Sequence, residues 1–145
     1  MSQAELPAVL IVDDEPHVIT LVRVTLEDES FRIIEATDGA QALAAAEETV
    51  PRLIFLDVRM PGVDGFEVCR RLRSDPRFSA TKIVMLTASG QEADRTRGIA
   101  AGADEYLTKP FSPLALLNLV HSLLSGETVW PEMSSLPRRS PTLGT

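Results

Sequence analysis

The sequence predicts an α/β domain built on a doubly wound, five-stranded parallel sheet with helices on both faces. Short apolar runs alternate with segments of helical character along the chain, which is the pattern of repeated strand-helix units. The runs are apolar throughout, as expected for parallel strands that are covered on both faces. In the common order for five such strands, 2-1-3-4-5, the order reverses between the first and third strands. Ligands bind at that reversal, beyond the carboxyl ends of the strands.

Each expected strand is a short run of aliphatic or β-branched residues. The first run leads directly into Asp13 and Asp14, the third into Asp57 and the fourth into Thr87. The second is followed by a turn signal, Asp38-Gly39. We therefore expect strands at residues 9–12, 31–36, 53–56, 83–86 and 105–107.

The segments between the strands carry helical signals of different strength. The first has an apolar face at i, i+3 and i+4 spacing, with Pro16 tolerated in its first turn. The second is rich in alanine, a strong helix former, and the third stops at Asp75-Pro76. The fourth is weaker and is capped by Gly102, and Ser112 opens the last. We expect helices near residues 16–26, 40–48, 66–72 and 91–101, and after 112.

Composition limits the classes of function. The 145 residues suffice for one domain with its own core. A net charge of -7 argues against a nucleic-acid surface within this chain, because phosphate contacts need clustered cations. The apolar runs are too short for a membrane span, and residues 1–7 lack the features of a signal peptide. We therefore expect a cytoplasmic protein without a membrane partner.

The single cysteine, Cys69, is interpreted as a small semi-buried hydrophobe.

The predicted topology brings three carboxylates together. Asp13 and Asp14 follow the first strand and Asp57 follows the third, so all three lie at the reversal of strand order. Such charges repel unless a proton, a cation or a metal intervenes. Mg²⁺ is the natural choice, because it prefers oxygen ligands and no histidine or cysteine occupies these strand ends.

Two further strand ends complete a phosphoryl site. Thr87 adds a hydroxyl donor and Lys109 a fixed cation to the carboxylates and the metal. Taken singly, each of these residues has a more ordinary interpretation: a strand-end aspartate usually caps a turn, and a lone threonine or lysine is usually structural or solvated. Their shared position at one edge of the sheet is what favours the chemical interpretation.

Four stretches of sequence carry a resemblance to a known family. They are VLIVDDE at 9–15, LDVRMPGVDG at 56–65, LTA at 86–88 and GADEYLTKPF at 102–111. Together they are specific, and the chain resembles a bacterial two-component response-regulator receiver domain, a CheY-like domain of flavodoxin-like fold. The resemblance covers residues 8–125. It leaves an N-terminal arm at 1–7 and a Pro/Ser-rich tail or linker at 126–145.

The resemblance implies roles for the strand-end residues. Asp57 would receive a phosphoryl group from the phosphohistidine of a sensor histidine kinase or phosphotransfer protein. Mg²⁺, with Mn²⁺ as an alternative, would be held by Asp14, Asp57 and the backbone carbonyl of Arg59, with Asp13 supporting through water. Lys109 would pair first with Asp57 and then with the phosphoryl oxygens.

The resemblance also implies a switch. Thr87 would donate a hydrogen bond to the phosphoryl group, and Ala88 would leave room for that group. The ring of Tyr106 would rotate as Thr87 moves inward. The surface of the fourth helix, fifth strand and fifth helix would then change, and a homodimer could form through it. The Lys109-Pro110 bond is expected to be cis. Arg59 and Ser89 occupy positions where the family tunes dephosphorylation.

The last helix and the tail leave questions open. Leu114 and Leu117 widen the apolar stripe of that helix beyond what one buried face needs. Either this surplus meets a partner or the helix is deeply packed. Residues 126–145 are either a loose terminus or a tether to an output domain, and Trp130 could pack back onto the domain. His17 and His121 are assigned to the surface or rim rather than to phosphotransfer.

The sequence favours one function over three alternatives. The first is a phosphorylation-dependent switch, standing alone or belonging to a larger regulator with an effector or output domain after residue 126; it would be no enzyme beyond its own phosphotransfer and autodephosphorylation. The second is a Mg²⁺-dependent phosphatase with an aspartyl-phosphate intermediate, which would want an aspartate where Arg59 stands. A degenerate, binding-only receiver is disfavoured by the intact aspartates. Flavin binding lacks a phosphate-cradling loop after the first strand.

Overall fold

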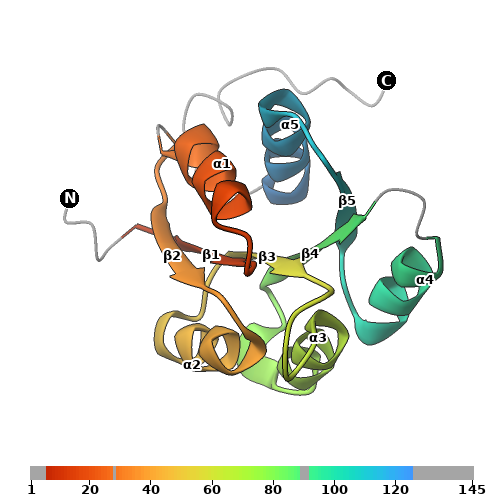
Figure 1. The fold of residues 1–145 in the computed structure, drawn as a ribbon. Helices are drawn as coiled ribbons and strands as arrows, with labels where there is room; N and C mark the ends of the chain where they lie inside the picture. Colours follow the sequence, from red (N-terminus) through yellow and green to blue (C-terminus); the bar gives the residue numbers. More distant parts are fainter. Residues whose placement is uncertain (1–5, 28, 89–91, 126–145) are drawn as a thin grey trace, which may run out of the picture.

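The protein forms a five-stranded parallel sheet in the order β2-β1-β3-β4-β5, which confirms the predicted fold (Figure 1). The structure is a computed structural model, and it describes residues 6–27, 29–88 and 92–125. The strands are β1 (Ala8–Val12), β2 (Arg32–Ala36), β3 (Leu53–Asp57), β4 (Lys82–Ala88) and β5 (Glu105–Lys109). The helices are α1 (Pro16–Leu26), α2 (Gly39–Thr49), α3 (Gly65–Arg73), α4 (Glu92–Ala101) and α5 (Pro113–Leu124), with a short 3₁₀ helix η2 (Pro76–Phe78).

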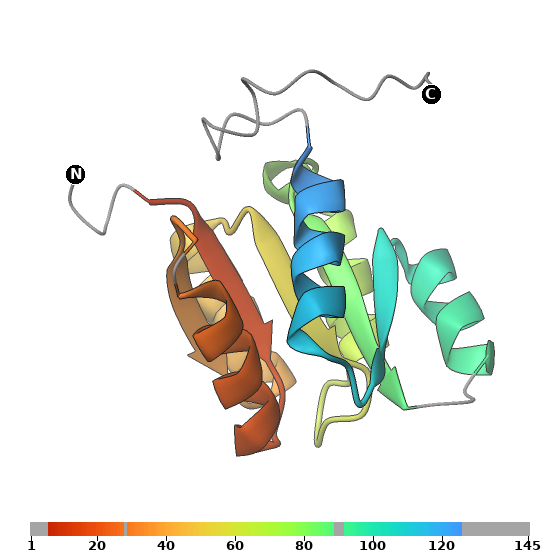
Figure 2. The ribbon, with the colours of Figure 1, turned by 90° about the horizontal axis from the view of Figure 1, so that it is seen from above.

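The helices cover the sheet in two layers. Helices α1 and α5 lie on one face and α2 and α3 on the other, with α4 beside α3 (Figures 1 and 2). Each layer has its own apolar core. The core under α1 and α5 includes Ile11, Phe55 and Leu116, and the core on the α2 and α3 side includes Leu10, Phe66 and Ala101. All residues of β1 and β3 are buried, because both strands are central and covered on both faces.

The strand register sets where each strand ends. Val12, the last residue of β1, lies opposite Leu56 of β3, so Asp13 and Asp57 both follow at the same edge. Strand β4 runs through Thr87 and Ala88 rather than ending at Leu86, because its pairing with β5 continues to Ala88 and Lys109. Strand β4 therefore continues two residues beyond the apolar run that predicted it.

Side-chain caps start three of the helices. The side chain of Asp38 accepts a hydrogen bond from the backbone N–H of Gln41 at the start of α2. At the start of α3 and α5, Asp64 and Ser112 each accept one from the backbone N–H three residues later. Such caps satisfy N–H groups that have no partner within the helix. Helix α4 is different, because its only buried residues are Asp94, Gly98 and Ala101. An added Cβ on Gly98 would lie 3.1 Å from Cγ of Met85 on β4, so α4 lies close against the sheet.

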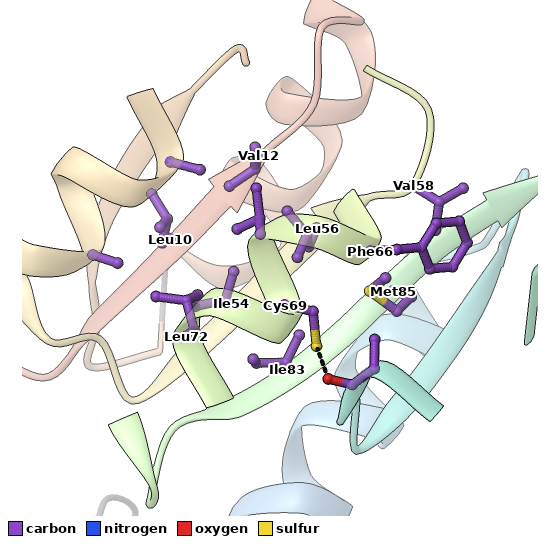
Figure 3. Close-up of a cluster of buried hydrophobic side chains, with 14 of the residues drawn as sticks. Leu10, Val12, Ile54, Leu56, Val58, Phe66, Cys69, Leu72, Ile83 and Met85 are labelled. Carbon is purple, nitrogen blue, oxygen red and sulfur yellow. Dashed lines mark hydrogen bonds between the residues drawn. The ribbon is translucent and has the colours of Figure 1, made fainter. Parts of the chain in front are cut away.

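Cys69 is fully buried in the core on the α2 and α3 side, rather than semi-buried (Figure 3). Its thiol donates to the carbonyl oxygen of Ala101 at 3.4 Å. Burial raises the pKa of Cys69 to about 11, so the thiol stays protonated at neutral pH. Its interpretation as a small apolar residue fits this environment.

The surplus apolar residues of α5 are divided between two environments. Leu117 packs partly buried against the core beneath α1 and α5, whereas Leu114 is 67% exposed. His17 is exposed, and Nε2 of His121 lies 3.5 Å from Oε1 of Glu29. Residues 1–5, Ser89, Trp130 and the rest of the tail lie outside the described residues. Among the residues that are described, no helix has the length and apolar character needed to span a membrane.

Candidate functional site

Three carboxylates meet at the carboxyl edge of the sheet. One oxygen each from Asp13, Asp14 and Asp57 lies within 4.8 Å of the others. Asp13 and Asp57 are buried, at 0% and 4% exposure, while Asp14 is exposed. This arrangement follows from the sequence, because β1 and β3 are neighbours that end in register. The cluster therefore has two buried members and one side open to solvent.

The cluster raises the pKa of Asp57 to about 6. Burial is the main cause, and the neighbouring charges of Asp13 and Asp14 act in the same direction. Two contacts oppose the rise: the backbone N–H of Arg59 donates to Oδ1 of Asp57 at 3.2 Å, and Lys109 lies nearby. The carboxyl of Asp57 is thus held where its charge is costly until a cation or an electrophile arrives.

Lys109 is the cation that faces the cluster. Its Nζ lies 2.9 Å from Oδ2 of Asp13 and 2.8 Å from Oε1 of Glu15, but 3.6 Å from Oδ1 of Asp57. Burial works to lower the pKa of Lys109, but the hydrogen bonds to Glu15 and Asp13 and the charge of Asp57 outweigh it, so the pKa is raised. The lysine therefore stays charged, and it is closer to two other carboxylates than to Asp57.

Glu15 belongs to the site, although it was not among the expected site residues. Its side chain accepts from Lys109, and this hydrogen bond and the lysine's charge lower the pKa of Glu15. Its backbone N–H donates to Oδ1 of Asp13 at 2.9 Å. The sequence contained one signal, since Glu15 directly follows the aspartate pair. That position alone did not indicate that its side chain would reach a lysine 94 residues later in the chain.

The donor set fits Mg²⁺. Oδ2 of Asp13 is buried, and Nζ of Lys109 at 2.9 Å is the one cation near it in the described part of the chain, so the oxygen keeps a free lone pair. A buried carboxylate oxygen with a free lone pair is suited to a cation. Octahedral Mg²⁺ separates neighbouring ligands by roughly 3 Å and opposite ones by roughly 4.2 Å, so a cluster within 4.8 Å can hold the ion if its side chains close in or a water bridges one of them. All three members offer hard oxygen ligands.

The remaining expected residues lie on the two strands beside Asp57. Thr87 is buried at 2% exposure near the end of β4, and Ala88 beside it is exposed. Tyr106 on β5 is partly buried, and the guanidinium carbon of Arg95 lies 4.6 Å from the centre of its ring. The Lys109–Pro110 peptide bond is cis.

Arg59 joins the site to α4. While its backbone N–H bonds Asp57, its guanidinium Nη2 lies 2.8 Å from both carboxylate oxygens of Asp94. The Asp94 side chain is 4% exposed and that of Arg59 is 62% exposed. Asp94 was not expected near the site, and nothing in its sequence context signals this contact, because it depends on how α4 packs.

A groove of about 290 Å³ opens beside the lysine. It is bounded by α1 on one side and by the β5–α5 connection on the other, including His17, Leu21, Pro110 and Phe111. Glu15 and Lys109 stand where the groove meets the carboxylate cluster. An apolar groove therefore borders the lysine side of the site.

Comparison with known proteins identifies this arrangement. Residues 9–121 match the model of the response regulator receiver domain. Transcriptional regulatory protein ResD of Bacillus subtilis is 46% identical over 124 residues, which are 86% of this chain and 50% of ResD. The chain spans about half the length of the curated relatives it matches first.

Two solved structures are similar to the whole domain. The chemotaxis response regulator CheY4 of Vibrio cholerae has a TM-score of 0.77 and 35% identity, covering 82% of this chain and 99% of that one. The receiver domain of the sensor histidine kinase PA1611 from Pseudomonas aeruginosa has a TM-score of 0.74 and 30% identity, covering 81% and 97%. That structure is described with a magnesium ion coordinated in its active site cleft. With the matching sequence, strand order and carboxylate cluster, this chain belongs to the response regulator receiver domain family of two-component signalling proteins.

Proposed function

We propose that this receiver domain is switched by phosphorylation of Asp57, with the phosphohistidine of a sensor histidine kinase or phosphotransfer protein as donor. The observation that carries the proposal is the position of Asp57: it is buried among carboxylates at the strand ends, with Lys109 at 3.6 Å. A buried, poorly stabilised carboxylate opposite a fixed cation is suited to accept an electrophilic, anionic group.

The chain's residues would act as follows. A carboxylate oxygen of Asp57 attacks phosphorus, the P–N bond to the donor histidine breaks, and the imidazole leaves with the bonding electron pair. Asp14, Asp57 and the backbone carbonyl of Arg59 would hold Mg²⁺ or Mn²⁺, with Asp13 supporting through water. That ion supplies neutralisation of the oxygen charges during transfer. Lys109 would move from Glu15 to the phosphoryl oxygens.

The switch itself is proposed for Thr87 and Tyr106. Thr87 would donate a hydrogen bond to a phosphoryl oxygen, with Ala88 leaving space for the group, and the ring of Tyr106 would rotate as Thr87 moves inward. The surface of α4, β5 and α5 would change in consequence. A shift from 1:99 to 99:1 needs about 5.5 kcal/mol of differential interaction. A phosphoryl group with about two negative charges beside Lys109 is a plausible source of it.

The proposal extends to the rest of the protein. Residues 8–125 are the receiver unit, 1–7 an arm, and 126–145 a linker to an effector or output domain, or a tail. Relatives such as ResD carry names of transcriptional regulators and are about twice as long as the matched region. A homodimer through α4, β5 and α5 and a cytoplasmic location belong to the same proposal.

Intact mass spectrometry tests the proposal. The protein is incubated with Mg²⁺ and a small acyl phosphate, beside Asp57→Asn and the control Asp38→Asn, whose new residue also caps a helix well. We expect a stable gain of one phosphoryl group in the wild type and the control and none in Asp57→Asn. Rapid hydrolysis of many phosphate esters would favour a phosphatase. No label with any divalent ion would favour a binding-only domain.

A further inference from the structure

Helix α4 is held in place largely by charged side chains. Its buried residues are small or acidic, so it contributes little apolar side-chain area to the core. Its cationic residues instead contact aromatic rings: Arg95 lies over Tyr106 at 4.6 Å, and Arg97 lies over Phe66 at 4.0 Å. Asp94, one residue before Arg95, is bound by Arg59. Contacts of this kind are individually modest and sensitive to nearby charge.

The contact between Arg59 and Asp94 is the one that reaches the phosphoryl site. Both oxygens of the Asp94 carboxylate lie 2.8 Å from Nη2 of Arg59. A carboxylate that is 4% exposed depends on its cation, because a buried charge without a partner is costly. The same Arg59 contacts Asp57 through its backbone N–H at 3.2 Å. One residue thus joins the acceptor aspartate to α4.

We propose that the Arg59–Asp94 ion pair is a latch that holds α4 in its resting position and opens when Asp57 is phosphorylated. Asp94 is a positioning residue in this proposal, since it acts on the site through Arg59. The proposal rests on the proposed function for its trigger. It adds a connection to α4 that does not pass through Thr87.

Competition between two anions opens the latch. Arg59 is two residues from Asp57, and its side chain is 62% exposed, so its guanidinium can turn toward new charge without leaving a core. A phosphoryl group brings about two negative charges, against one on Asp94. If Arg59 turns, Asp94 loses its partner and is no longer stable in its buried position. The start of α4 then moves, and the stacking of Arg95 on Tyr106 loosens with it.

Reciprocity sets the sign of the expected effect. If phosphorylation opens the latch, then opening the latch in advance favours phosphorylation by the same factor. Asp94→Asn removes the charge that holds Arg59 while keeping the side-chain shape. With hydrolysis of the aspartyl phosphate measured separately and allowed for, we expect the labelled fraction with a small acyl phosphate to correspond to an equilibrium constant about five-fold higher or more, the lower end of ordinary coupling.

Asp104→Asn is the matched control. Asp104 also pairs with an arginine, Arg73, at 2.6 Å, but at the opposite edge of the sheet. Intact mass gives the labelled fraction of wild type, Asp94→Asn and Asp104→Asn. Hydrogen exchange of the amides after the first turn of α4, whose N–H groups bond to carbonyl oxygens of that turn, gives the opening of the start of the helix. Asp94→Asn should raise both the labelled fraction and the exchange rate. Asp104→Asn should change neither, although it destabilises the fold.

A second approach breaks the latch from its other side. Arg59→Gln should also speed exchange of the α4 amides that bond to the first turn, and the double variant with Asp94→Asn should add little to the larger single effect. Exchange that is fast in Asp94→Asn with an unchanged labelled fraction would mean a merely structural ion pair, and would overturn the latch. So would unchanged exchange in both variants. If the wild type takes no label, the proposed function fails, and the phosphorylation-triggered latch fails with it.

Discussion

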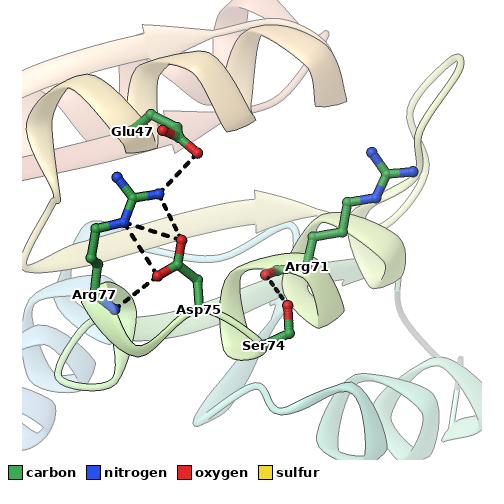
Figure 4. Close-up of polar contacts among 5 residues, drawn as sticks. All are labelled: Glu47, Arg71, Ser74, Asp75 and Arg77. Carbon is green, nitrogen blue, oxygen red and sulfur yellow. Dashed lines mark hydrogen bonds and ion pairs between the residues drawn. The ribbon is translucent and has the colours of Figure 1, made fainter.

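The two ends of the strands differ in their charges. We call the side where the strands begin the first edge and the side where they end the second edge. At the edge where the strands begin, Arg73 donates to the carbonyl oxygens of Gly102 and Phe78 at 2.8 and 2.9 Å and pairs with Asp104. Arg77 there bridges Asp75 and Glu47 (Figure 4). At the edge where the strands end, three carboxylates gather and Lys109 is the one cation within ion-pair distance of Asp13 and Asp57 among the described residues.

The difference separates stability from function. At the first edge, Arg73 and Arg77 pair with carboxylates of the protein itself and need no bound ion, so these contacts can anchor the fold. The second edge is unfavourable by itself and becomes favourable when a cation binds. Changes at the first edge should therefore alter stability without altering signalling, and changes at the second should alter both.

The largest effect is expected at the first edge. Arg73→Met keeps much of the length of the side chain but removes the cation that pairs with Asp104 and the guanidinium donors to the carbonyl oxygens of Gly102 and Phe78. Asp104 then keeps the backbone N–H of Ile83, and the Phe78 carbonyl keeps that of Thr81. We expect a loss of about 3 kcal/mol in the free energy of unfolding, as for other broken, partly buried pairs. Urea unfolding followed by circular dichroism measures it. An altered rate of Asp57 labelling under conditions where the variant is folded would contradict the separation of the two edges.

Mg²⁺ should stabilise the second edge. An ion that binds only the folded state at 100 times its dissociation constant contributes about 2.7 kcal/mol. The thermal midpoint of the wild type should rise with Mg²⁺ concentration, and that of Asp57→Asn should rise much less. An equal rise in both proteins would place the ion elsewhere.

The charge of Asp57 should itself be destabilising when no divalent ion is present. Its pKa is raised to about 6 from 3.8, so the folded state holds the proton more tightly than the unfolded state, and stability falls as the pH rises through this window. Two pKa units correspond to about 2.7 kcal/mol, and solvent screening at this half-open cluster reduces that to about 1 kcal/mol. Asp57→Asn should therefore be more stable than wild type at pH 7.5.

The same comparison at low pH is the control. Near pH 3 Asp57 is protonated in both states, so the advantage of Asp57→Asn should vanish there. Unfolding of both proteins with a chelator present, at several pH values, measures the difference. A constant advantage across the range would mean that packing, not charge, is responsible.

The smallest effect concerns the backbone at the first edge. Val50, which ends α2, has a φ of 41°, in the left-handed region that disfavours β-branched residues. Val50→Gly removes this strain but adds freedom to the unfolded chain. We expect a net gain of about 0.5 kcal/mol, measured by thermal unfolding, with no change in Mg²⁺ affinity. A loss of stability would mean that the half-exposed valine contributes more by contact than it loses by strain.

The parts of the molecule that the sequence predicted well are those governed by strand ends. Apolar runs located the strands, and the parallel topology alone brought Asp13, Asp14 and Asp57 to one edge. Long side chains that cross between elements escaped prediction. The contacts of Glu15 with Lys109 and of Arg59 with Asp94 depend on rotamers and on helix placement, and neither leaves a periodic pattern in the sequence.

The fit of α4 against β4 bears on how fast the protein can respond. At Gly98 the helix presents no side chain, and Met85, the residue it meets there, is flexible. Helices that interlock through large side chains must lift out of one another before they slide. Over Glu92–Ala101, helix α4 buries no large apolar side chain against β4, so such interlocking does not oppose its movement. We expect the apolar contacts of α4 to add little to the barrier for its movement, so that the rate is set by its charged contacts, such as the Arg59–Asp94 pair, rather than by repacking.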